Sequence, residues 1–260
     1  MPLRPPRLRA GARIGVVSPS YWIEPERLDR AVGVFEAAGY ELVIGPSVTA
    51  RQHKFAGTPE ERAADIMAMF EDSAIDAIEI NISCPNVKEG GVAFGNDPEM
   101  SARVVAACRK HTNKPLITKL SPNQTDIQEN ARLCIEAGTD GFSVINTLMG
   151  MAIDTATRRP IIGNTQGGLS GPAIKPIALL KVHQVYQVAK AHGVPIIGQG
   201  GITTVNDAIE FLVAGAAAIG IGTALFYDPL VCDKINAGIA EYLAQHGFAS
   251  VTELTGSLQT

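Results

Sequence analysis

Short apolar runs alternate with longer amphipathic stretches along the whole chain. The runs are typical of buried strands, and the stretches between them have the apolar spacing of helices. Seven strands are predicted, over residues 13–18, 41–45, 74–82, 115–120, 141–146, 194–198 and 217–221. Apolar strands that alternate with helices indicate a parallel sheet that helices cover on both faces.

Capping residues mark where several helices begin. Thr58 and Glu61 form a capping box with Pro59 at the first helical position, and Asp97 and Thr204 are expected to cap two more helices. Helices are predicted over residues 25–38, 58–70, 98–110, 126–138, 174–191 and 205–213, with a helical tail after the last strand and room for a small hairpin in an insertion over residues 151–171.

The predicted fold class is α/β, a TIM-barrel-like parallel (β/α) barrel with seven strands where a TIM barrel has eight. Two interpretations are open: an eighth strand lies within residues 46–55, or the barrel has seven strands and closes incompletely. The β/α rhythm runs through residue 77 without a linker. We therefore expect one barrel-like domain over residues 1–260, built from a segment 1–77 and a segment 78–260.

Composition narrows the class of protein. The hydrophobic fraction of 46%, the charged fraction of 18% and the net charge of −4 fit a globular protein that binds neither nucleic acid nor an acidic membrane surface. No apolar run approaches the ~20 residues of a membrane span, and no secretory signal is recognisable. The cysteines are widely spaced without a C-x-x-C pair, which favours free thiols in a cytoplasmic protein over disulfides or a metal site. They are Cys84, Cys108, Cys134 and Cys232.

Polar residues follow the predicted strands where ligands of parallel sheets bind. The loop after the third strand carries Asn81, Ser83, Cys84 and Asn86. Cys84 is a candidate base if its thiol is exposed and its pKa is lowered, and the alternative is a turn with a buried, inert cysteine. Lys119 ends the fourth strand; it either meets an anion or polar ligand or extends its ammonium group to solvent.

Glycine-rich turns follow the last two strands, at residues 199–202 and 220–223, and a third glycine-rich loop spans residues 167–171. Turns of this kind after the last strands of an α/β barrel bind phosphate groups through backbone N–H groups and a helix dipole. The order of the turns on consecutive strands predicts a phosphate site there.

From about Ile78 onward the chain resembles class 1B dihydroorotate dehydrogenases. The shared motifs occur in the family's order: NISCPNVKEGG at 81–91, KLSPN at 119–123, INTL at 145–148, GGLSGPA at 167–173, GGI at 200–202 and GT at 222–223. The resemblance implies FMN as cofactor and dihydroorotate or orotate as the small-molecule ligand. Enzymes of this family work with a partner subunit that carries an iron–sulfur cluster and FAD, and that subunit is a doubtful partner for this chain.

The resemblance implies a role for each motif residue. Cys84 would be the base that takes a proton from dihydroorotate while hydride passes to the flavin, and Lys119 would face the flavin's pyrimidine edge. The substrate would be held by Asn81, Ser83, Asn86, Asn146 and Thr147. The FMN phosphate would lie in a cradle of Gly171, Gly200, Gly201, Gly222 and Thr223.

The first third resembles a different family, the LD-carboxypeptidases, which are serine peptidases with a flavodoxin-like N-terminal domain. The similar segments are LRPPRL at 3–8, RIGVVSPS at 13–20 and AGTPEERAAD at 56–65. Neither Ser18 nor Ser20 matches the peptidase nucleophile. We interpret the chain as a chimera, most simply an engineered one, in which a flavodoxin-like fragment is joined near residues 76–79 to a half-barrel.

Three functions follow from these resemblances. The expected one is a chimera that keeps the FMN-phosphate cradle and part of the active site without efficient turnover, because the flavin-contacting Lys and the orotate-binding Asn that the family carries early in its barrel have no match in residues 1–75. The alternative is an active FMN-dependent dihydroorotate dehydrogenase of pyrimidine biosynthesis. The third function, that of a peptidase, has the weakest support. An open sheet edge would also permit a homodimer.

The phosphate cradle can be tested by substitution. We expect Gly200→Asp to weaken FMN binding, because the new carboxylate would lie against the phosphate. A flavin titration of the variant measures the change, and an unchanged FMN affinity would contradict the cradle assignment.

Overall fold

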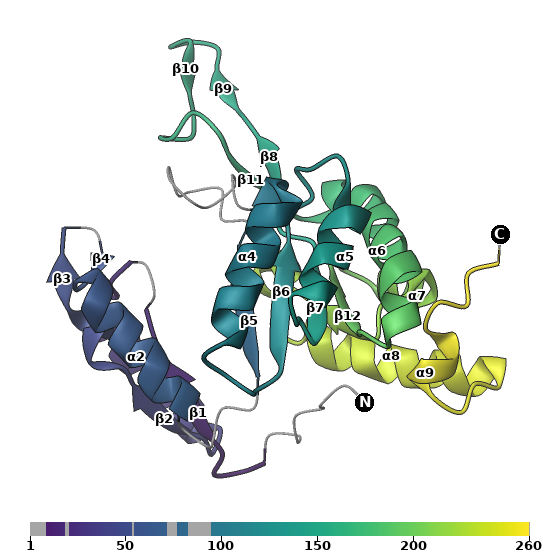
Figure 1. Cartoon of the computed structure of the whole chain (residues 1–260), viewed down its shortest axis with the longest axis horizontal. Helices are drawn as coiled ribbons and strands as arrows, with labels where there is room; N and C mark the ends of the chain where they lie inside the picture. The colour runs from purple at the N-terminus through teal and green to yellow at the C-terminus, as the bar shows by residue number, and fades with distance from the viewer. Residues whose placement is uncertain (1–8, 19–20, 54, 72–76, 83–94, 260) are drawn as a thin grey trace. The chain divides into compact units, whose positions relative to one another are not determined.

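The computed structural model describes residues 9–18, 21–53, 55–71, 77–82 and 95–259 (Figure 1). The described residues divide into two compact units, one up to residue 78 and the other from residue 79 onward. This division lies one residue from the segment boundary predicted at 77/78. Each unit is described by itself.

The first unit is a βαβ arrangement followed by a short hairpin and a helix. Strands β1 and β2 pair in parallel, and α1 connects them, with a proline in its first turn. The elements are β1 (Arg13–Val16), α1 (Pro25–Ala37), β2 (Glu41–Ile44), the 3-10 helix η1 (Pro46–Thr49), β3 (Arg51–Gln52), β4 (Phe55–Ala56) and α2 (Pro59–Glu71). The interpretation of an eighth barrel strand within residues 46–55 is wrong, because this stretch forms η1 and one side of the antiparallel β3–β4 hairpin.

In the first unit a buried carboxylate, that of Asp65, joins α2 to the turn after β2. The backbone N–H and the hydroxyl of Ser47 donate to Asp65 Oδ2 at 2.8 and 2.6 Å, and the side chains of both residues are buried. A Cβ at Gly45 would lie 2.5 Å from the same oxygen. Glycine at residue 45 therefore lets α2 approach the turn after β2 closely enough for the bond to form.

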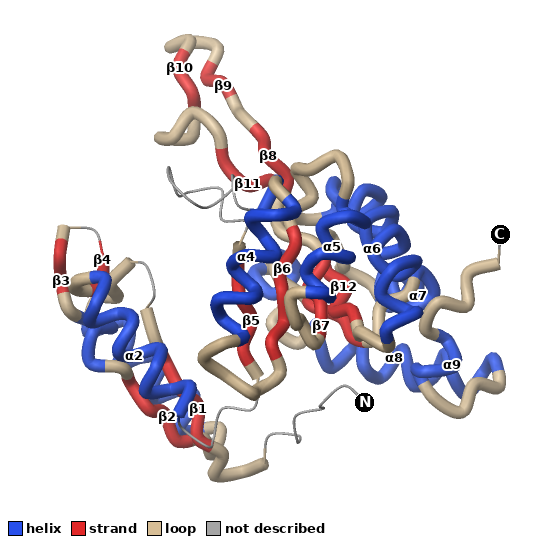
Figure 2. The backbone as a smooth tube through the Cα atoms, in the orientation of Figure 1, coloured by secondary structure: helices blue, strands red, loops and turns tan. Residues whose placement is uncertain are grey.

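The second unit is built on a five-stranded sheet in the order β13-β12-β7-β6-β5. The strands pair in parallel from β6 through β7 and β12 to β13. Helices lie beside the sheet, each packed against the next along the chain from α4 to α8 (Figure 2). The sheet strands are β5 (Ile78–Asn81), β6 (Leu116–Leu120), β7 (Gly141–Val144), β12 (Ile196–Gln199) and β13 (Ala218–Gly220). The helices are α4 (Pro98–Arg109), α5 (Ile127–Glu136), η2 (Pro172–Ile174), α6 (Lys175–Ala189), η3 (Lys190–His192), α7 (Val205–Ala214), η4 (Thr223–Phe226), α8 (Val231–His246) and α9 (Val251–Leu254). None of the described helices is long and apolar enough to cross a membrane.

A two-stranded arm projects from this unit between β7 and η2 (Figure 1). Its strands pair antiparallel: β8 (Leu148–Gly150) with β11 (Gly167–Leu169), and β9 (Ile153–Asp154) with β10 (Arg159–Pro160). Asn123 fixes the base of the arm, since its Nδ2 donates to Thr147 O at 3.0 Å and its Oδ1 accepts from Met149 N at 2.8 Å. The hairpin expected within the insertion is confirmed.

All seven predicted strands are present, and the predicted helix caps are confirmed. Thr58 and Glu61 exchange the two bonds of a capping box, Asp97 accepts from two N–H groups of α4, and Thr204 forms a capping box with Asp207. Among the described residues, however, the strands form two parallel sheets of two and five strands instead of one sheet of seven. A single barrel-like domain over the whole chain stays a prediction.

Arg109, the last residue of α4, joins the segments that lead into β6 and β7. Its guanidinium group donates to the carbonyl oxygens of Gly138, Thr112 and Lys114 at 3.0–3.1 Å and forms an ion pair with Asp140. Asp140 also accepts from Leu116 N at 2.8 Å. One side chain thus satisfies carbonyl groups after α4 and after α5 and holds the carboxylate that anchors the start of β6.

We expect Arg109→Ala to lower the free energy of unfolding by about 2 kcal/mol or more, because it leaves a partly buried carboxylate and several carbonyl groups without a charged donor. Urea unfolding measures the change. Arg132→Ala is the matched control, since Arg132 makes its ion pairs with Glu129 and Glu136 on an exposed helix face and should change little. Equal effects of the two substitutions would contradict the role given to Arg109.

Candidate functional site

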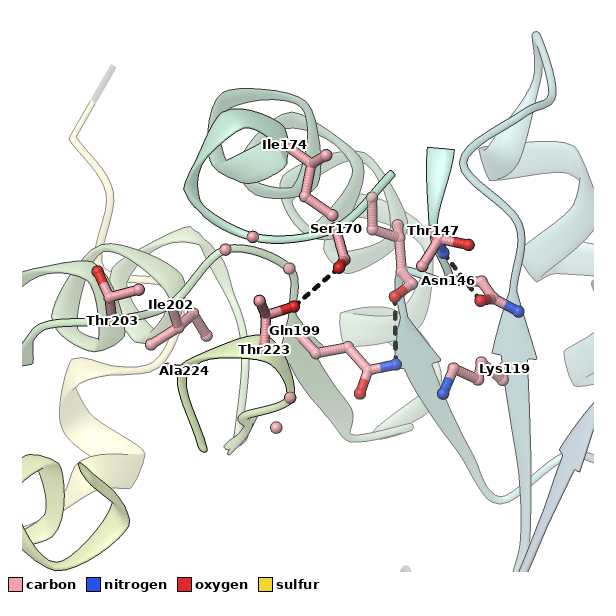
Figure 3. A pocket seen from close by; sticks show the side chains of 16 residues that line it. Lys119, Asn146, Thr147, Ser170, Ile174, Gln199, Ile202, Thr203, Thr223 and Ala224 are labelled. Carbon is pink, nitrogen blue, oxygen red and sulfur yellow. Dashed lines mark hydrogen bonds between the residues drawn. The ribbon is translucent and has the colours of Figure 1, made fainter. Parts of the chain in front are cut away.

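A cavity of about 150 Å³ opens at the carboxyl ends of β6, β7, β12 and β13 (Figure 3). Its wall consists of Lys119 near the end of β6, residues 145–147 after β7, residues 170, 171 and 174 before α6, residues 199–203 at and after the end of β12, and residues 220 and 222–224 at and after the end of β13. Because parallel strands end at the same edge of a sheet, loops that are far apart in the sequence meet in one site.

The glycine turn after β12 forms one end of the cavity. Gly200 and Gly201 have φ angles of +133° and +80°, which side chains rarely adopt. A Cβ at Gly200 would lie 2.7 Å from Ala178 Cβ, and one at Gly201 would lie 2.6 Å from Gly171 O. Glycine is therefore required at both residues, both for the backbone angles and for the close approach of the turn to α6 and the loop before it.

The backbone N–H groups around this end are available to a ligand. Within the described part of the chain, the N–H groups of Gly200, Gly201, Gly222 and Thr223 donate to no other residue. They lie in the wall of the cavity, and α7 begins shortly after the glycine turn. Unpaired N–H groups beside a helix N-terminus favour an anion. Such a group of donors suits a phosphate.

A hydroxyl pair closes the same end. Thr223 Oγ1 donates to Ser170 Oγ at 2.8 Å, which links the loop after β13 to the loop before η2 (Figure 3). Both hydroxyl groups belong to residues of the cavity wall. The five predicted cradle residues, Gly171, Gly200, Gly201, Gly222 and Thr223, are thus all brought together in one wall.

Lys119 lines the other side of the cavity. In β6 the side chains of Leu116, Thr118 and Leu120 are buried, and the strand's alternation turns Lys119 to the opposite face. Its Nζ lies 3.5 Å from Glu79 Oε1, and its side chain is 22% exposed. The ammonium group is therefore held at the sheet edge beside the cavity, where it can meet a negatively charged or polar ligand.

Two asparagines lie together near Lys119. Asn146 Nδ2 donates to Asn81 Oδ1 at 3.0 Å, and Asn146 Oδ1 accepts from Thr147 N at 2.8 Å. Asn146 and Thr147 line the cavity. These contacts bring Asn81, from the end of β5, beside the two predicted substrate residues that follow β7.

The structure adds wall residues that the sequence did not single out. Gln199 Nε2 donates to Ile145 O at 3.2 Å, so the amide joins the ends of β12 and β7 (Figure 3). Ser170 and Ile174 also line the cavity. A signal for Gln199 existed, because a polar residue ends an apolar strand directly before a glycine pair. Ser170 lay within a loop already noted, and nothing in the pattern marked Ile174.

Three predicted site residues, Ser83, Cys84 and Asn86, lie outside the described residues, so the role of Cys84 as a base stays a prediction. The remaining cysteines have free thiols. Burial raises the pKa of Cys134 to about 12 and also raises the pKa of Cys108, whereas Cys232 is exposed. The described residues contain no cluster of side chains that could hold a metal ion.

Comparison with known proteins identifies relatives of this chain. A family model described as dihydroorotate dehydrogenase matches residues 44–243, which begins ahead of the resemblance placed at Ile78. The catalytic subunit of dihydroorotate dehydrogenase B (NAD(+)) from Pelobacter propionicus is 51% identical over 205 residues, 79% of this chain and 66% of that protein. The same subunit from Geotalea daltonii is 55% identical over 185 residues, 71% of this chain and 60% of that one.

A solved structure agrees on the fold. The ligand-free type DHODH of Eimeria tenella matches with a TM-score of 0.64 at 21% identity, over 94% of this chain and 80% of that chain. This similarity, together with the parallel five-stranded sheet, gives the chain an α/β barrel-like fold. The chain spans just under two thirds of the length of the curated relatives that it matches. The family match covers most of the chain, and the chain belongs to the dihydroorotate dehydrogenase family.

Proposed function

We propose that this chain is an FMN-dependent dihydroorotate dehydrogenase, which oxidises dihydroorotate to orotate. One observation carries the proposal: at one end of a single cavity lie backbone N–H groups that donate to no described residue, and Lys119, Asn146 and Thr147 lie on the other side. The first set suits a phosphate, and the second suits a polar ring system. The names of the relatives, at about half the residues identical, support the same activity.

The chemistry of the cradle fits the phosphate of FMN. Gly200 and Gly201 line the cavity and carry no side chain, so the backbone of this turn faces the cavity directly. The donors there are backbone N–H groups and the hydroxyl of Ser170, which accepts from the Thr223 hydroxyl and keeps its own proton. A cradle of neutral donors near a helix N-terminus binds phosphate without the desolvation of a buried cation.

FMN, when bound, supplies the hydride acceptor of the reaction. In the proposal, Lys119 would face the flavin's polar ring edge and its ammonium group would favour negative charge there; its Nζ lies 3.5 Å from Glu79 Oε1, which limits its movement. Asn81 and Asn146 orient each other through their hydrogen bond and hold the polar groups of the substrate. Cys84 takes the proton from the substrate, a role that rests on the resemblance of its loop to the family.

Partner subunits belong to the same proposal. The relatives are named as catalytic subunits of an NAD(+)-linked enzyme. Their names support a second subunit for this chain as well, in contrast to the doubt drawn from the sequence. A homodimer remains a further expectation of the sequence.

A second candidate is a chain that holds FMN in the cradle without efficient turnover. It rests on the expectation from the sequence that the family's early flavin-contacting Lys and orotate-binding Asn have no match in residues 1–75. It includes the interpretation of the first third as a flavodoxin-like, LD-carboxypeptidase-like fragment joined to a half-barrel. The two candidates share the cradle and differ only in whether dihydroorotate reduces the bound flavin.

We expect the purified protein, mixed with FMN, to show the absorbance of a bound flavin, and this absorbance to bleach when dihydroorotate is added without oxygen. Bleaching supports the dehydrogenase. A bound flavin that does not bleach would contradict it in favour of the second candidate. A protein that binds no flavin would contradict both.

Gly222 allows a sharper test of the cradle than Gly200. A side chain at Gly200 would collide with Ala178, whereas no atom of the described residues lies within 4 Å of a Cβ at Gly222, whose φ is −120°. We expect Gly222→Asp to raise the Kd for FMN by about tenfold or more, because it adds a negative charge beside the phosphate. Gly222→Ala is the matched control and should leave the Kd within about twofold of wild type. Similar FMN affinities of the two variants would contradict the assignment.

A further inference from the structure

A buried carboxylate lies directly behind the glycine turn. Asp207 Oδ2 accepts from the backbone N–H groups of Thr203 and Thr204 at 3.0 and 2.9 Å and from the Thr203 hydroxyl at 3.0 Å. Its other oxygen, Oδ1, accepts from Lys175 Nζ at 2.6 Å. Every bond on Oδ2 thus fixes the segment that leads from Gly201 into α7.

Lys175 extends this cluster to the opposite loop. It is the first residue of α6, which follows the loop that carries Ser170 and Gly171. Its Nζ contacts Asp207 at 2.6 Å and Glu210 Oε2 at 2.8 Å, and both acidic residues are on α7. The ion pairs therefore join the first turns of the two helices that follow two of the loops of the cradle.

The glycine turn before α7 also lies close to Lys175, the first residue of α6. A Cβ at Gly201 would lie 3.1 Å from Lys175 N and 3.1 Å from Lys175 Cβ, besides its approach to Gly171 O. The glycine turn is thus packed against the start of α6. A shift of either helix would move the N–H groups of Gly200 and Gly201 relative to those of the neighbouring loop.

We propose that Asp207, through Lys175, Thr203 and Thr204, is a positioning residue that fixes the glycine turn for phosphate and thereby lets the chain distinguish FMN from riboflavin. The inference deepens the proposed function and rests on it. Asp207 lies behind the turn and does not line the cavity, so it acts through the residues that it holds.

Asp207 and Lys175 both carry their charges at neutral pH. Burial opposes ionisation of Asp207, but the hydrogen bonds from Lys175, Thr203 and Thr204 outweigh it and hold the pKa of the carboxyl well below its usual range. The bonds with Asp207 and Glu210 raise the pKa of Lys175. Both groups therefore remain ionised through the neutral pH range, and the bridge between the helices does not depend on pH there.

Asp207 also completes the capping box of α7, in which Thr204 Oγ1 accepts from Asp207 N at 3.1 Å. A substitution therefore lowers stability even if the residue has no part in ligand binding. The two roles predict different ligand effects. General destabilisation weakens FMN and riboflavin binding alike, whereas a displaced phosphate turn weakens FMN binding alone, because riboflavin has the same ring system and no phosphate.

The test is a pair of fluorescence titrations, with FMN and with riboflavin, on the full chain and on the variants Asp207→Asn and Lys175→Met. Asp207→Asn keeps an oxygen that can accept at the cap, so the fold is retained, while both variants remove the charge pair. We expect the ratio of the riboflavin Kd to the FMN Kd to fall by about tenfold in each variant. Asp126→Ala is the control, since Asp126 caps α5 by accepting from Glu129 N at 2.9 Å and does not line the cavity.

A ratio unchanged in both variants, while the wild-type chain still prefers FMN, would overturn the inference and leave the proposed function intact. An equal fall in the Asp126→Ala control would overturn it too, because the loss would then follow from lower stability. A wild-type chain that binds no FMN would contradict the proposed function and the inference together.

Discussion

The site depends on one steric constraint, the approach of the Gly200–Gly201 turn to the start of α6. No Cβ fits at either residue, since Ala178 and the carbonyl oxygen of Gly171 already occupy the space. The approach brings loops from two βα units to one point. It also leaves N–H groups that donate to no residue in the described part of the chain, and such groups need a ligand or water. The shape and the chemistry of the cavity thus have the same origin.

The surrounding structure holds that approach from the outside. The charge pair of Lys175 and Asp207 joins the two helix starts, and Thr223 and Ser170 join the loops by their hydroxyl groups. At the opposite ends of the strands, Arg109 and Asp140 anchor the start of β6. One set of polar contacts positions loops for a ligand, and the other fixes strand ends far from it. This division agrees with the general rule that the carboxyl ends of parallel strands carry function and the amino ends carry stability.

The two sides of the cavity differ in their chemistry. The glycine end offers neutral N–H donors, whereas Lys119 brings a cation that Glu79 partly balances. A ligand with a phosphate at one end and a polar ring at the other would match both. Membership in the dihydroorotate dehydrogenase family and the arrangement of the cavity therefore support the same class of ligand from independent evidence.

The sequence determined the local structure of this protein. Apolar runs specified seven strands, and Thr58, Asp97 and Thr204 specified helix starts, because strand burial and helix capping depend on neighbouring residues. The glycine turns and Lys119 were also visible, since glycine pairs and a cation in an apolar strand are unusual in any context.

Only the tertiary structure decided how these pieces combine. The pairing of strands into sheets of two and five, the place of Gln199 in the cavity wall and the bond between Asn81 and Asn146 all depend on residues far apart in the chain. The same holds for the ion pair of Lys175 and Asp207. In the sequence alone, Lys175 is a lysine at the start of a helix and Asp207 is a residue in the first turn of another. Contacts of this kind arise from how helices pack on a sheet, and the apolar pattern of one segment carries no information on the partner that it meets.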